Sequence, residues 1–391
     1  MKKTPKKSTW IALLCVAALL AAVVVLENVL DPNKNIMVFA ALKKGAVYAL
    51  VAVSMNLLNG FTGLFSLGQA GFMLLGAYTY AILSVPVADR AAVYYLYGGS
   101  AVNFSFQDMF GALFGTEGLG GAVSMGLGVV VAMVLAGCVA AAFAYLIGLP
   151  VLRLKSDYLA IATLGFAEII KAVFQWQALG PVTNGANMIK NFPTFSSFNI
   201  TGPDGKTVIL RLSVFFPFLV SMICITLIVM LINSSYGRAF KAIREDEIAA
   251  EAMGINLAKH KMLSFCTSAF FAGISGAMFA MFVANAQAKV YTTTMTYEIL
   301  LIVVIGGIGS ISGSVMATFL YVACSEWWLR FLDNEITLSN GMKLPLLRAG
   351  FRMVVFSIVI MIVVLFFRKG IMGDRELPDL FKKRRKKEAV Q

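Results

Sequence analysis

Long apolar segments recur along almost the whole chain, and they constrain its fold more than any other feature. An α-helix needs about 20 apolar residues to cross the hydrocarbon core of a bilayer. On that measure we predict ten membrane spans, at residues 10–29, 43–60, 66–85, 122–149, 158–177, 212–233, 263–285, 292–308, 314–331 and 350–367. The predicted fold class is therefore all-α, a polytopic bundle of about ten transmembrane helices.

The composition agrees with a membrane protein and argues against a soluble one. Hydrophobic residues make up 59% of the chain and charged residues 14%, more apolar surface than one soluble core of this length would bury. The net charge of +13 would suit nucleic acid, but the basic residues cluster at the chain ends and at the ends of apolar segments. Because that distribution is typical of membrane topology, we expect the lipid bilayer, and no nucleic acid, as a partner.

Basic residues at both ends predict that both termini lie in the cytoplasm. Lysines precede the first apolar segment, and residues 382–387 are all Lys or Arg. The positive-inside rule places such clusters on the cytoplasmic side. No small-x-small cleavage pattern follows the first segment, so we expect an uncleaved span. The predicted organisation is a basic N-terminus (1–9), a transmembrane domain (10–367) and a basic tail (368–391).

Two long segments fall outside the cell on this topology. Residues 86–121 are rich in Tyr and Phe, and residues 178–211 carry several Gly, Pro and Asn turn signals. Aromatic residues beside a span usually mark the level of the lipid headgroups. A docking surface for another protein is the functional alternative for 86–121, and the sequence leaves both interpretations open.

No constellation typical of an enzyme is visible. The single histidine, His260, stands between two lysines, and the Gly-Lys-Thr at 205–207 lacks the earlier glycine of a phosphate loop because Ile200 occupies that position. The five cysteines lie in apolar segments without metal-ligand spacing. We therefore expect no catalytic residue, no metal and no cofactor, and any ATP chemistry must come from a partner.

Charged and polar residues within predicted spans are candidates for function, because charge is costly inside a membrane. Glu168 and Lys171 lie three residues apart, so they share a helix face and can form a pair. Such a pair either faces the bundle interior or lines a translocation path. Asn56, Asn59, Gln69 and Gln175 carry the same ambiguity.

Two glycine-rich turns share one spacing. Gly60-x-x-Gly63-x-x-Ser66 and Gly306-x-x-Gly309-x-x-Ser312 each stand between a descending and a rising span, on the predicted cytoplasmic side. They suggest an internal repeat of the kind found in transporters. The candidate residues of a translocation path or of gating turns are Asn59, Gly60, Gly63, Ser66, Gln69, Glu168, Lys171, Gly306 and Gly309.

The predicted cytoplasmic segment 237–261 contains a short helix with its own boundaries. Asp246 suits its N-cap, Glu247 the positive end of its dipole, and Gly254 the left-handed residue after its end. Just before it, Arg238, Lys241 and Arg244 recur every third residue, on a face that could rest on anionic headgroups. Because so short a helix is a poor isolated structure, it makes most sense in a groove on another protein; an ordinary interfacial loop helix is the alternative.

Residues 237–256 resemble the coupling-helix region of LivM-type permeases of the branched-chain amino-acid ABC importers. Residues 59–72, 157–166 and 306–310 resemble the same family. The resemblance implies a permease in the bacterial cytoplasmic (inner) membrane, paired with a second similar permease, two cytoplasmic ATPase subunits and an extracytoplasmic solute-binding protein. It also implies that a coupling helix docks on an ATPase subunit, through the set Arg244, Glu245, Asp246, Glu247, Ala250, Glu251 and Gly254.

Two departures from the family pattern leave alternatives open. The family commonly shows a Thr-Gly-Gly stretch where this chain has Thr183-Asn184-Gly185, and the segment 86–121 is longer than usual. Urea or another short amide is therefore an alternative substrate. An ion-coupled secondary transporter, with Glu168 and Lys171 as coupling groups, is an alternative of another class, and a membrane receptor or scaffold is a third.

Overall fold

The computed structural model describes residues 6–30, 35–115, 118–154, 156–201 and 208–328, together with 355, 358, 361, 370–373 and 376. These residues are almost entirely helical. The longer helices are α1 (Lys6–Val29), α2 (Ile36–Asn56), α3 (Gln69–Ser84), α6 (Gly118–Val151), α7 (Ser156–Gln175), α9 (Phe215–Asn233), α12 (Leu257–Val283), α13 (Thr293–Gly306) and α14 (Ile311–Val322). Two π-helical segments, Leu57–Phe61 and Ala323–Trp327, extend α2 and α14.

Shorter elements connect these helices. They are α4 (Arg90–Val93), α5 (Phe106–Phe114), α8 (Gly180–Thr183), α10 (Ser235–Glu245), α11 (Glu247–Ala252), and the antiparallel strands β1 (Ile200–Thr201) and β2 (Val208–Leu210). Single 3-10 turns occupy Val87–Asp89, Tyr95–Tyr97, Gln177–Leu179, Phe195–Phe198 and Ala288–Val290. The all-α prediction is confirmed for the described residues apart from this one small hairpin.

Five described helices are long and apolar enough to cross a membrane: Ile36–Phe61, Gly120–Val151, Tyr158–Gln175, Phe215–Asn233 and Leu257–Val283. A sixth follows if α3 and Val87–Val93, bent by 100° at the break between them, count as one broken span. Ala18–Val29, Thr293–Gly306 and Ile311–Glu326 are shorter apolar helices. The chain is a polytopic helical membrane protein. The predicted tenth span, 350–367, lies almost wholly outside the described residues, so the count of ten stays a prediction.

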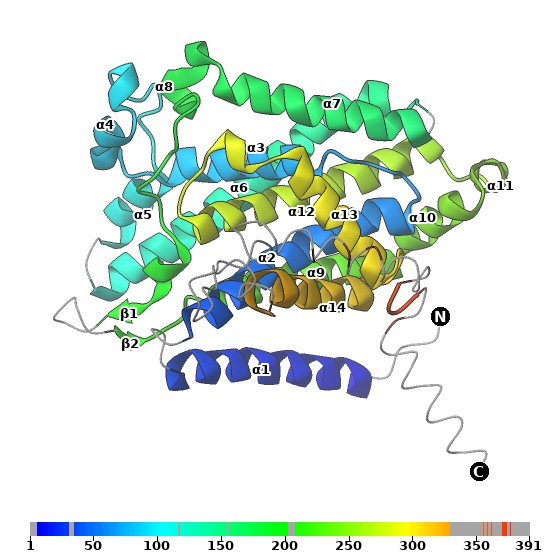
Figure 1. The fold of residues 1–391 in the computed structure, drawn as a ribbon, viewed down its shortest axis with the longest axis horizontal. Helices are drawn as coiled ribbons and strands as arrows, with labels where there is room; N and C mark the ends of the chain where they lie inside the picture. The colour runs from blue at the N-terminus through cyan, green and yellow to red at the C-terminus, as the bar shows by residue number, and fades with distance from the viewer. Residues whose placement is uncertain are drawn as a thin grey trace, which may run out of the picture.

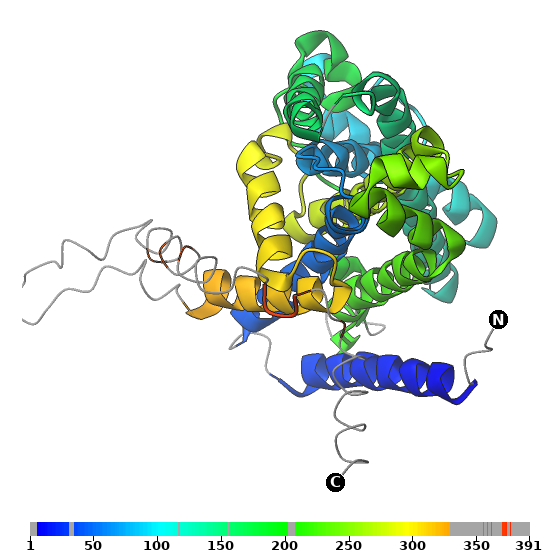
Figure 2. The same cartoon turned by 90° about the vertical axis from the view of Figure 1, so that its right-hand side faces the viewer.

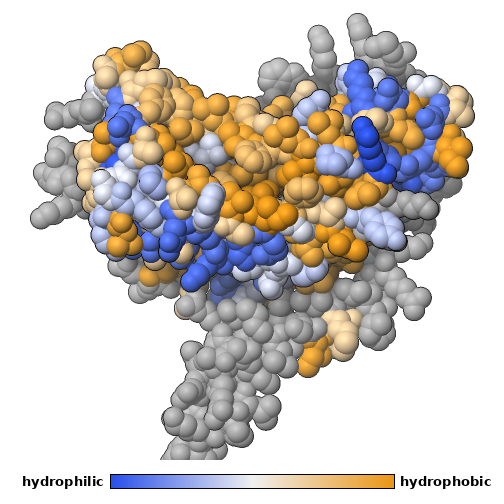
Figure 3. Space-filling view, turned by 90° about the horizontal axis from the view of Figure 1, so that it is seen from above, coloured by the Kyte–Doolittle hydropathy of each residue, from blue (hydrophilic) through white to orange (hydrophobic). Residues whose placement is uncertain are grey.

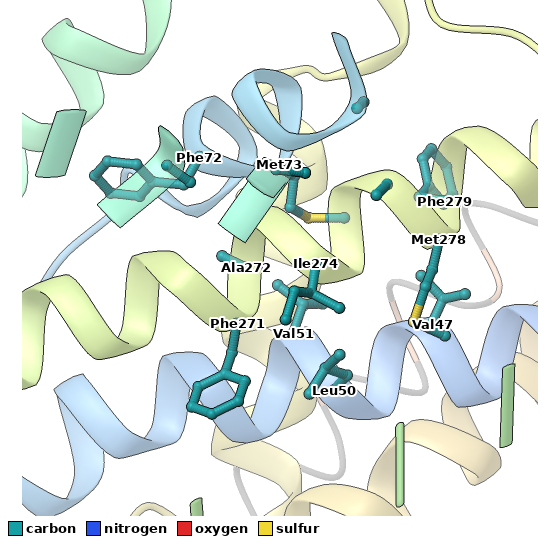
Figure 4. Packing of buried hydrophobic residues seen from close by; sticks show 14 of the residues in the cluster. Val47, Leu50, Val51, Phe72, Met73, Phe271, Ala272, Ile274, Met278 and Phe279 are labelled. Atoms are coloured by element: carbon teal, nitrogen blue, oxygen red, sulfur yellow. The ribbon is translucent and has the colours of Figure 1, made fainter. Parts of the chain in front are cut away.

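Helix α12 forms the centre of the bundle. Beyond Lys261 it is apolar or small on all its faces, a pattern typical of a buried helix, and it packs against α2, α3 and α6. Figure 4 shows buried side chains of α2, α3 and α12 packed together, among them Val47, Leu50, Val51, Phe72, Met73, Phe271, Ala272, Ile274, Met278 and Phe279.

Glycines allow α3 to approach α12 closely. A methyl group added at Gly276 would lie 1.9 Å from the carbonyl oxygen of Met73, and one added at Gly76 would lie 2.0 Å from that of Gly273. Helix backbones reach such a separation only where the residues between them are very small. These positions therefore set the spacing of the two most buried helices.

The outer helices present apolar side chains to the surroundings. Exposed large hydrophobic residues lie on α6, α7 and α9, among them Val134, Leu146, Ile161, Ile169, Leu227 and Met230. Seen from the side of α7, hydrophobic side chains cover the middle of the molecule, and hydrophilic ones gather mainly toward its ends and one edge (Figure 3). Lipid is the solvent that suits such a surface. Helix α1 lies below α9 and α14 in Figures 1 and 2, and its C-terminal end is held to the bundle because Glu27 accepts hydrogen bonds from Ser213 and Val214.

The connecting elements separate into two ends of the bundle. Helices α4, α5 and α8 and both strands lie at one end, and α10 and α11 lie at the other (Figure 1). The segments predicted to be external, 86–121 and 178–211, therefore lie opposite the segment predicted to be cytoplasmic, 237–261. Which end faces the cytoplasm stays a prediction.

A buried arginine organises the end that carries α4. The Arg90 side chain donates hydrogen bonds to the carbonyl oxygens of Ile82 (2.7 Å), Val102 and Phe104, and the residue is only 3% exposed. The neighbouring Tyr94 donates to the Val182 carbonyl at 3.0 Å, and burial raises the pKa of Tyr94 to about 12. The long segment after α3 is thus a folded structure held to the bundle.

Candidate functional site

Helices α10 and α11 form a compact unit whose boundaries follow from local sequence. The Asp246 carboxylate accepts hydrogen bonds from the backbone N–H groups of Ile248 (2.9 Å) and Ala249 (3.1 Å), so it caps the N-terminus of α11. Gly254, with φ of +84°, stands just after the helix, and the N–H of Ile255 donates to the Ala250 carbonyl at 3.1 Å. The predicted cap and stop residues are both confirmed.

Helix α11 exposes apolar side chains at the tip of the molecule. Ile248 and Met253 are 82% and 84% exposed, whereas Ala250 is buried. Glu247 forms an ion pair with Lys261 at 2.6 Å, which fixes α11 to the start of α12. Helix α11 has six residues, and Met253 follows it directly. Two large apolar side chains exposed on so short a segment are typical of a surface that contacts another molecule.

Helix α10 connects this tip to the first glycine-rich turn. The Arg244 guanidinium donates a hydrogen bond to the Gly60 carbonyl oxygen at 2.9 Å, and it pairs with Glu245 at 2.7 Å. The Lys241 ammonium lies 5.5 Å from the centroid of the Phe61 ring. Arg244 and Lys241 therefore contact protein, although both residues, like Arg238, are exposed. Contact of this basic face with lipid headgroups stays a prediction.

The turn 60–66 is closely fitted to its neighbours. Gly63 has φ of +76°, and a methyl group there would lie 3.0 Å from Arg244 Cγ. The N–H of Ser66 donates to Asn59 Oδ1 at 3.2 Å, closing the turn. Because Gly63 combines a left-handed backbone with this crowding, any other residue would displace the turn or Arg244.

Asn56 joins the two glycine-rich turns. Its Oδ1 accepts from the Gly309 N–H at 2.8 Å, and its Nδ2 donates to the Ser310 carbonyl at 2.9 Å and to Ser314 Oγ at 2.8 Å. A methyl group on Gly60 would lie 2.6 Å from the Gly309 nitrogen. The structure thus brings together two turns that the sequence separates by about 250 residues.

The turn at 306–309 has a partner that the sequence did not suggest. Glu376, in the predicted basic tail, accepts hydrogen bonds from the backbone N–H groups of Ile311 (2.7 Å) and Ser312 (3.1 Å) at the start of α14. A carboxylate there satisfies free backbone donors and complements the helix dipole. No periodicity or spacing links Glu376 to residues more than 60 positions earlier.

Gln69 lies at the start of α3, beside the first turn. Its Nε2 donates to Ser268 Oγ at 2.9 Å, and the residue is buried. Its Oε1 and the Nδ2 of Asn59 are buried atoms without a hydrogen-bond partner among the described residues. Unsatisfied buried polar atoms are rare in folded proteins, so these two distinguish this layer from the apolar packing around it.

Glu168 and Lys171 form the predicted pair on α7, with 3.5 Å between Nζ and Oε2. Thr293, the first residue of α13, also donates to the Glu168 carboxylate. The Glu168 side chain is 48% exposed and that of Lys171 22%. The pair therefore lies partly exposed beside α13, and both interpretations open from the sequence stay predictions.

Comparison with known protein families identifies the chain. Residues 37–366 match the family described as branched-chain amino acid transport system, permease component. The chain belongs to this permease family. The match covers α2 to α14 and so includes both glycine-rich turns and the α10–α11 unit.

Individual relatives of this permease carry related names. The chain is 30% identical over 319 residues to the high-affinity branched-chain amino acid transport system permease protein LivM of Salmonella typhimurium, which covers 76% of this chain and 64% of the relative. It is 22% identical over 342 residues to the probable branched-chain amino acid transport permease protein LivM of Methanocaldococcus jannaschii, covering 85% and 92%. The permease thus spans less than two thirds of the Salmonella relative. No solved structure matches it.

Within the described ranges, no three His, Cys, Asp or Glu side chains are placed to hold a metal ion. The site itself consists of hydrogen-bonded turns and an exposed helix.

Proposed function

We propose that this chain is a membrane-spanning subunit of an ATP-driven, binding-protein-dependent importer for branched-chain amino acids. The observation that carries the proposal is the hydrogen bond from Arg244 of α10 to the Gly60 carbonyl oxygen. It joins the exposed helix α11, through α10, to the turn that precedes the buried polar side chains of α3. Family membership and the LivM names of relatives support the substrate class. On this proposal the chain has ten spans, with both termini and α11 in the cytoplasm.

Helix α11 is the docking element for a cytoplasmic ATPase subunit. Its bare side chains, Ile248 and Met253, fill an apolar groove on that subunit, and burial of each stabilises the contact by about 1.5–3 kcal/mol. Acidic residues surround the tip (Glu245, Asp246, Glu247 and Glu251) and favour a basic rim on the partner.

Movement of α11 reaches the membrane domain through α10. Because Arg244 is bonded to Gly60, and Asn56 bonds the second turn at Gly309, displacement of the docked tip shifts both turns together. The buried polar layer with Asn59, Ser66 and Gln69 lies directly beyond them. We assign this layer to the gate of the translocation path.

The second permease covers the face formed by α7 and α13. A carboxylate that is half exposed at mid-span would be costly against lipid, so Glu168 and Lys171 need water or protein beside them. A partner permease on this face would enclose a path lined by these two residues and Thr293. The ammonium and carboxylate groups of a passing amino acid are complementary to the pair.

Co-purification tests the assignment. The full chain is purified in mild detergent from its native membranes, as wild type, as the double variant Ile248→Glu/Met253→Glu, and as the control Ile209→Glu, which alters an exposed isoleucine at the opposite end. We expect an ATP-hydrolysing subunit, identified by mass spectrometry, with wild type and control but not with the double variant. A wild type that purifies without any ATPase would overturn the assignment and favour ion-coupled transport.

A further inference from the structure

A cavity of about 380 Å³ lies at the end of the bundle opposite α11. It is bounded by the end of α1, the first turns of α2, the loop around the Phe195–Phe198 turn, the residues just before α9 and the end of α12. This corner carries the β1–β2 hairpin in Figure 1. A volume of this size falls within the range of roughly 300–1,000 Å³ that is typical of small-molecule sites.

The charges of the cavity are unbalanced. Lys43 and Arg211 line it, and neither side chain has an ion-pair partner in the part of the chain that the structure describes. Glu27 is the one acidic residue of the lining. Its carboxylate is already bonded, since it accepts from Ser213 Oγ at 2.6 Å and from the Val214 N–H at 3.0 Å. Glu27 still attracts Lys43 electrostatically, and the lining as a whole carries two cations and one carboxylate, an excess of positive charge that favours an anionic ligand.

The rest of the lining is amphipathic. Hydroxyl and amide groups stand beside the cations, from Thr194, Ser196 and Asn199, and apolar residues form the remaining wall, from Ile36, Phe39, Phe195 and Phe282. Ile36 is 62% exposed, and the neighbouring α1 is largely apolar on its outer surface. A ligand that fits has an anionic polar group and an apolar part.

The positions of Lys43 and Arg211 near the end of the bundle suit contact with lipid headgroups. Lys43 lies seven residues into α2, about 10 Å along the helix axis from Ile36 at 1.5 Å per residue, and its side chain can extend back toward the helix end. Arg211 follows the β2 strand outside any long helix.

We propose that this cavity binds the phosphate group of an anionic phospholipid, held by Lys43 and Arg211, with an acyl chain along the wall at Ile36 and Phe39. The apolar wall favours a lipid over a free phosphate ion, which would gain nothing from it. The proposal needs only that the chain spans a membrane and does not depend on what the chain transports.

Lipid retention tests the proposal. The full chain is purified in detergent containing equal amounts of phosphatidylglycerol and phosphatidylcholine, and the bound lipids are measured by mass spectrometry. The test variant is Lys43→Met/Arg211→Gln, and the control Lys190→Gln/Lys289→Gln removes two exposed cations from the same end. Wild type and control should retain phosphatidylglycerol preferentially, and the test variant should lose that preference by about tenfold.

Three results would overturn the proposal. The test variant could keep the wild-type preference, wild type could retain both lipids equally, or millimolar inorganic phosphate could displace phosphatidylglycerol, which would indicate a site for free anions. If the double variant does not fold, Arg211→Gln alone decides, because Arg211 lies in a connection and outside the packed helices. The same purification retains any partner subunits, so loss of lipid preference is read separately from loss of an ATPase.

Discussion

The Arg244 guanidinium lies 2.9 Å from the Gly60 carbonyl oxygen, across 184 residues of sequence. This hydrogen bond joins the helix before the exposed tip to the turn between α2 and α3. A hydrogen bond from a charged donor contributes about 1.5–3 kcal/mol, and here the acceptor belongs to backbone that also packs on Gly309. Together with the contact of Lys241 with the Phe61 ring, this hydrogen bond is the basis for the proposed coupling of the two parts.

Removal of the cap on α11 should weaken docking without unfolding the protein. Asp246→Ala loses two hydrogen bonds to backbone N–H groups, at a cost of about 1 kcal/mol to this helix. We expect about fivefold weaker binding of the ATPase subunit in a titration of the purified proteins. Asp246→Asn, which preserves the cap but removes one of the four acidic charges around the tip, should bind more tightly than Asp246→Ala; equal weakening by both variants would show that the charge matters and the cap does not.

Close packing of α3 on α12 predicts a large effect from a very small substitution. Gly276→Ala places a methyl group 1.9 Å from the Met73 carbonyl oxygen, so the helices must separate, at a cost of about 1–3 kcal/mol. We expect a lower Tm in detergent. Gly165→Ala is the matched control, because nothing lies within 4 Å of that position, and it should leave the Tm unchanged or raise it slightly. Equal Tm values would contradict the packing described.

Arg90 should not be replaceable by lysine. Its planar guanidinium bonds several carbonyl oxygens at once, which a single ammonium does not reproduce. Arg90→Lys should expose residues 86–104 to limited proteolysis at least several-fold faster than wild type. Arg153→Lys, at an exposed position, should change nothing. Resistance of Arg90→Lys to the protease would show that the segment is held by other contacts.

The pair on α7 should tolerate joint removal better than the loss of one partner. Glu168→Gln or Lys171→Met alone leaves an uncompensated charge on the face proposed to meet the second permease, where charge away from bulk water is costly. We expect either single variant to assemble poorly with the second permease. The double variant should recover assembly but transport its amino acid at least about tenfold more slowly, as measured by uptake into vesicles. Normal uptake by the double variant would exclude the pair from the path.

Features that depend on neighbouring residues could be predicted from the sequence, whereas contacts between residues far apart in the chain could not. The cap at Asp246, the stop at Gly254 and the pairing of Glu168 with Lys171 depend on residues within one or two helical turns. The roles of Arg90 and Glu376, and the bond from Asn56 to the second turn, depend on tertiary contacts that no local pattern encodes.

The boundaries of the membrane spans also depend on contacts between distant residues, and their prediction was less accurate than that of the spans themselves. The third span was predicted from residue 66, yet α3 begins at Gln69, because Ser66 and Leu67 direct their backbone N–H groups to Asn59 and Thr163. The bend of 100° after α3 was also missed. Hydropathy gives the apolar content of a segment but not where hydrogen bonds to other helices interrupt it.

The central claim is that Arg244 transmits movement from the docked tip to the gate. Its most direct test measures ATP hydrolysis and amino-acid uptake together, in vesicles that contain the complete complex with Arg244→Met, beside Arg238→Met as an exposed control on the same helix. We predict that Arg244→Met hydrolyses ATP within about twofold of wild type while uptake per ATP falls at least about tenfold. The control should match wild type in both. Uptake per ATP at the wild-type level in Arg244→Met would contradict the account.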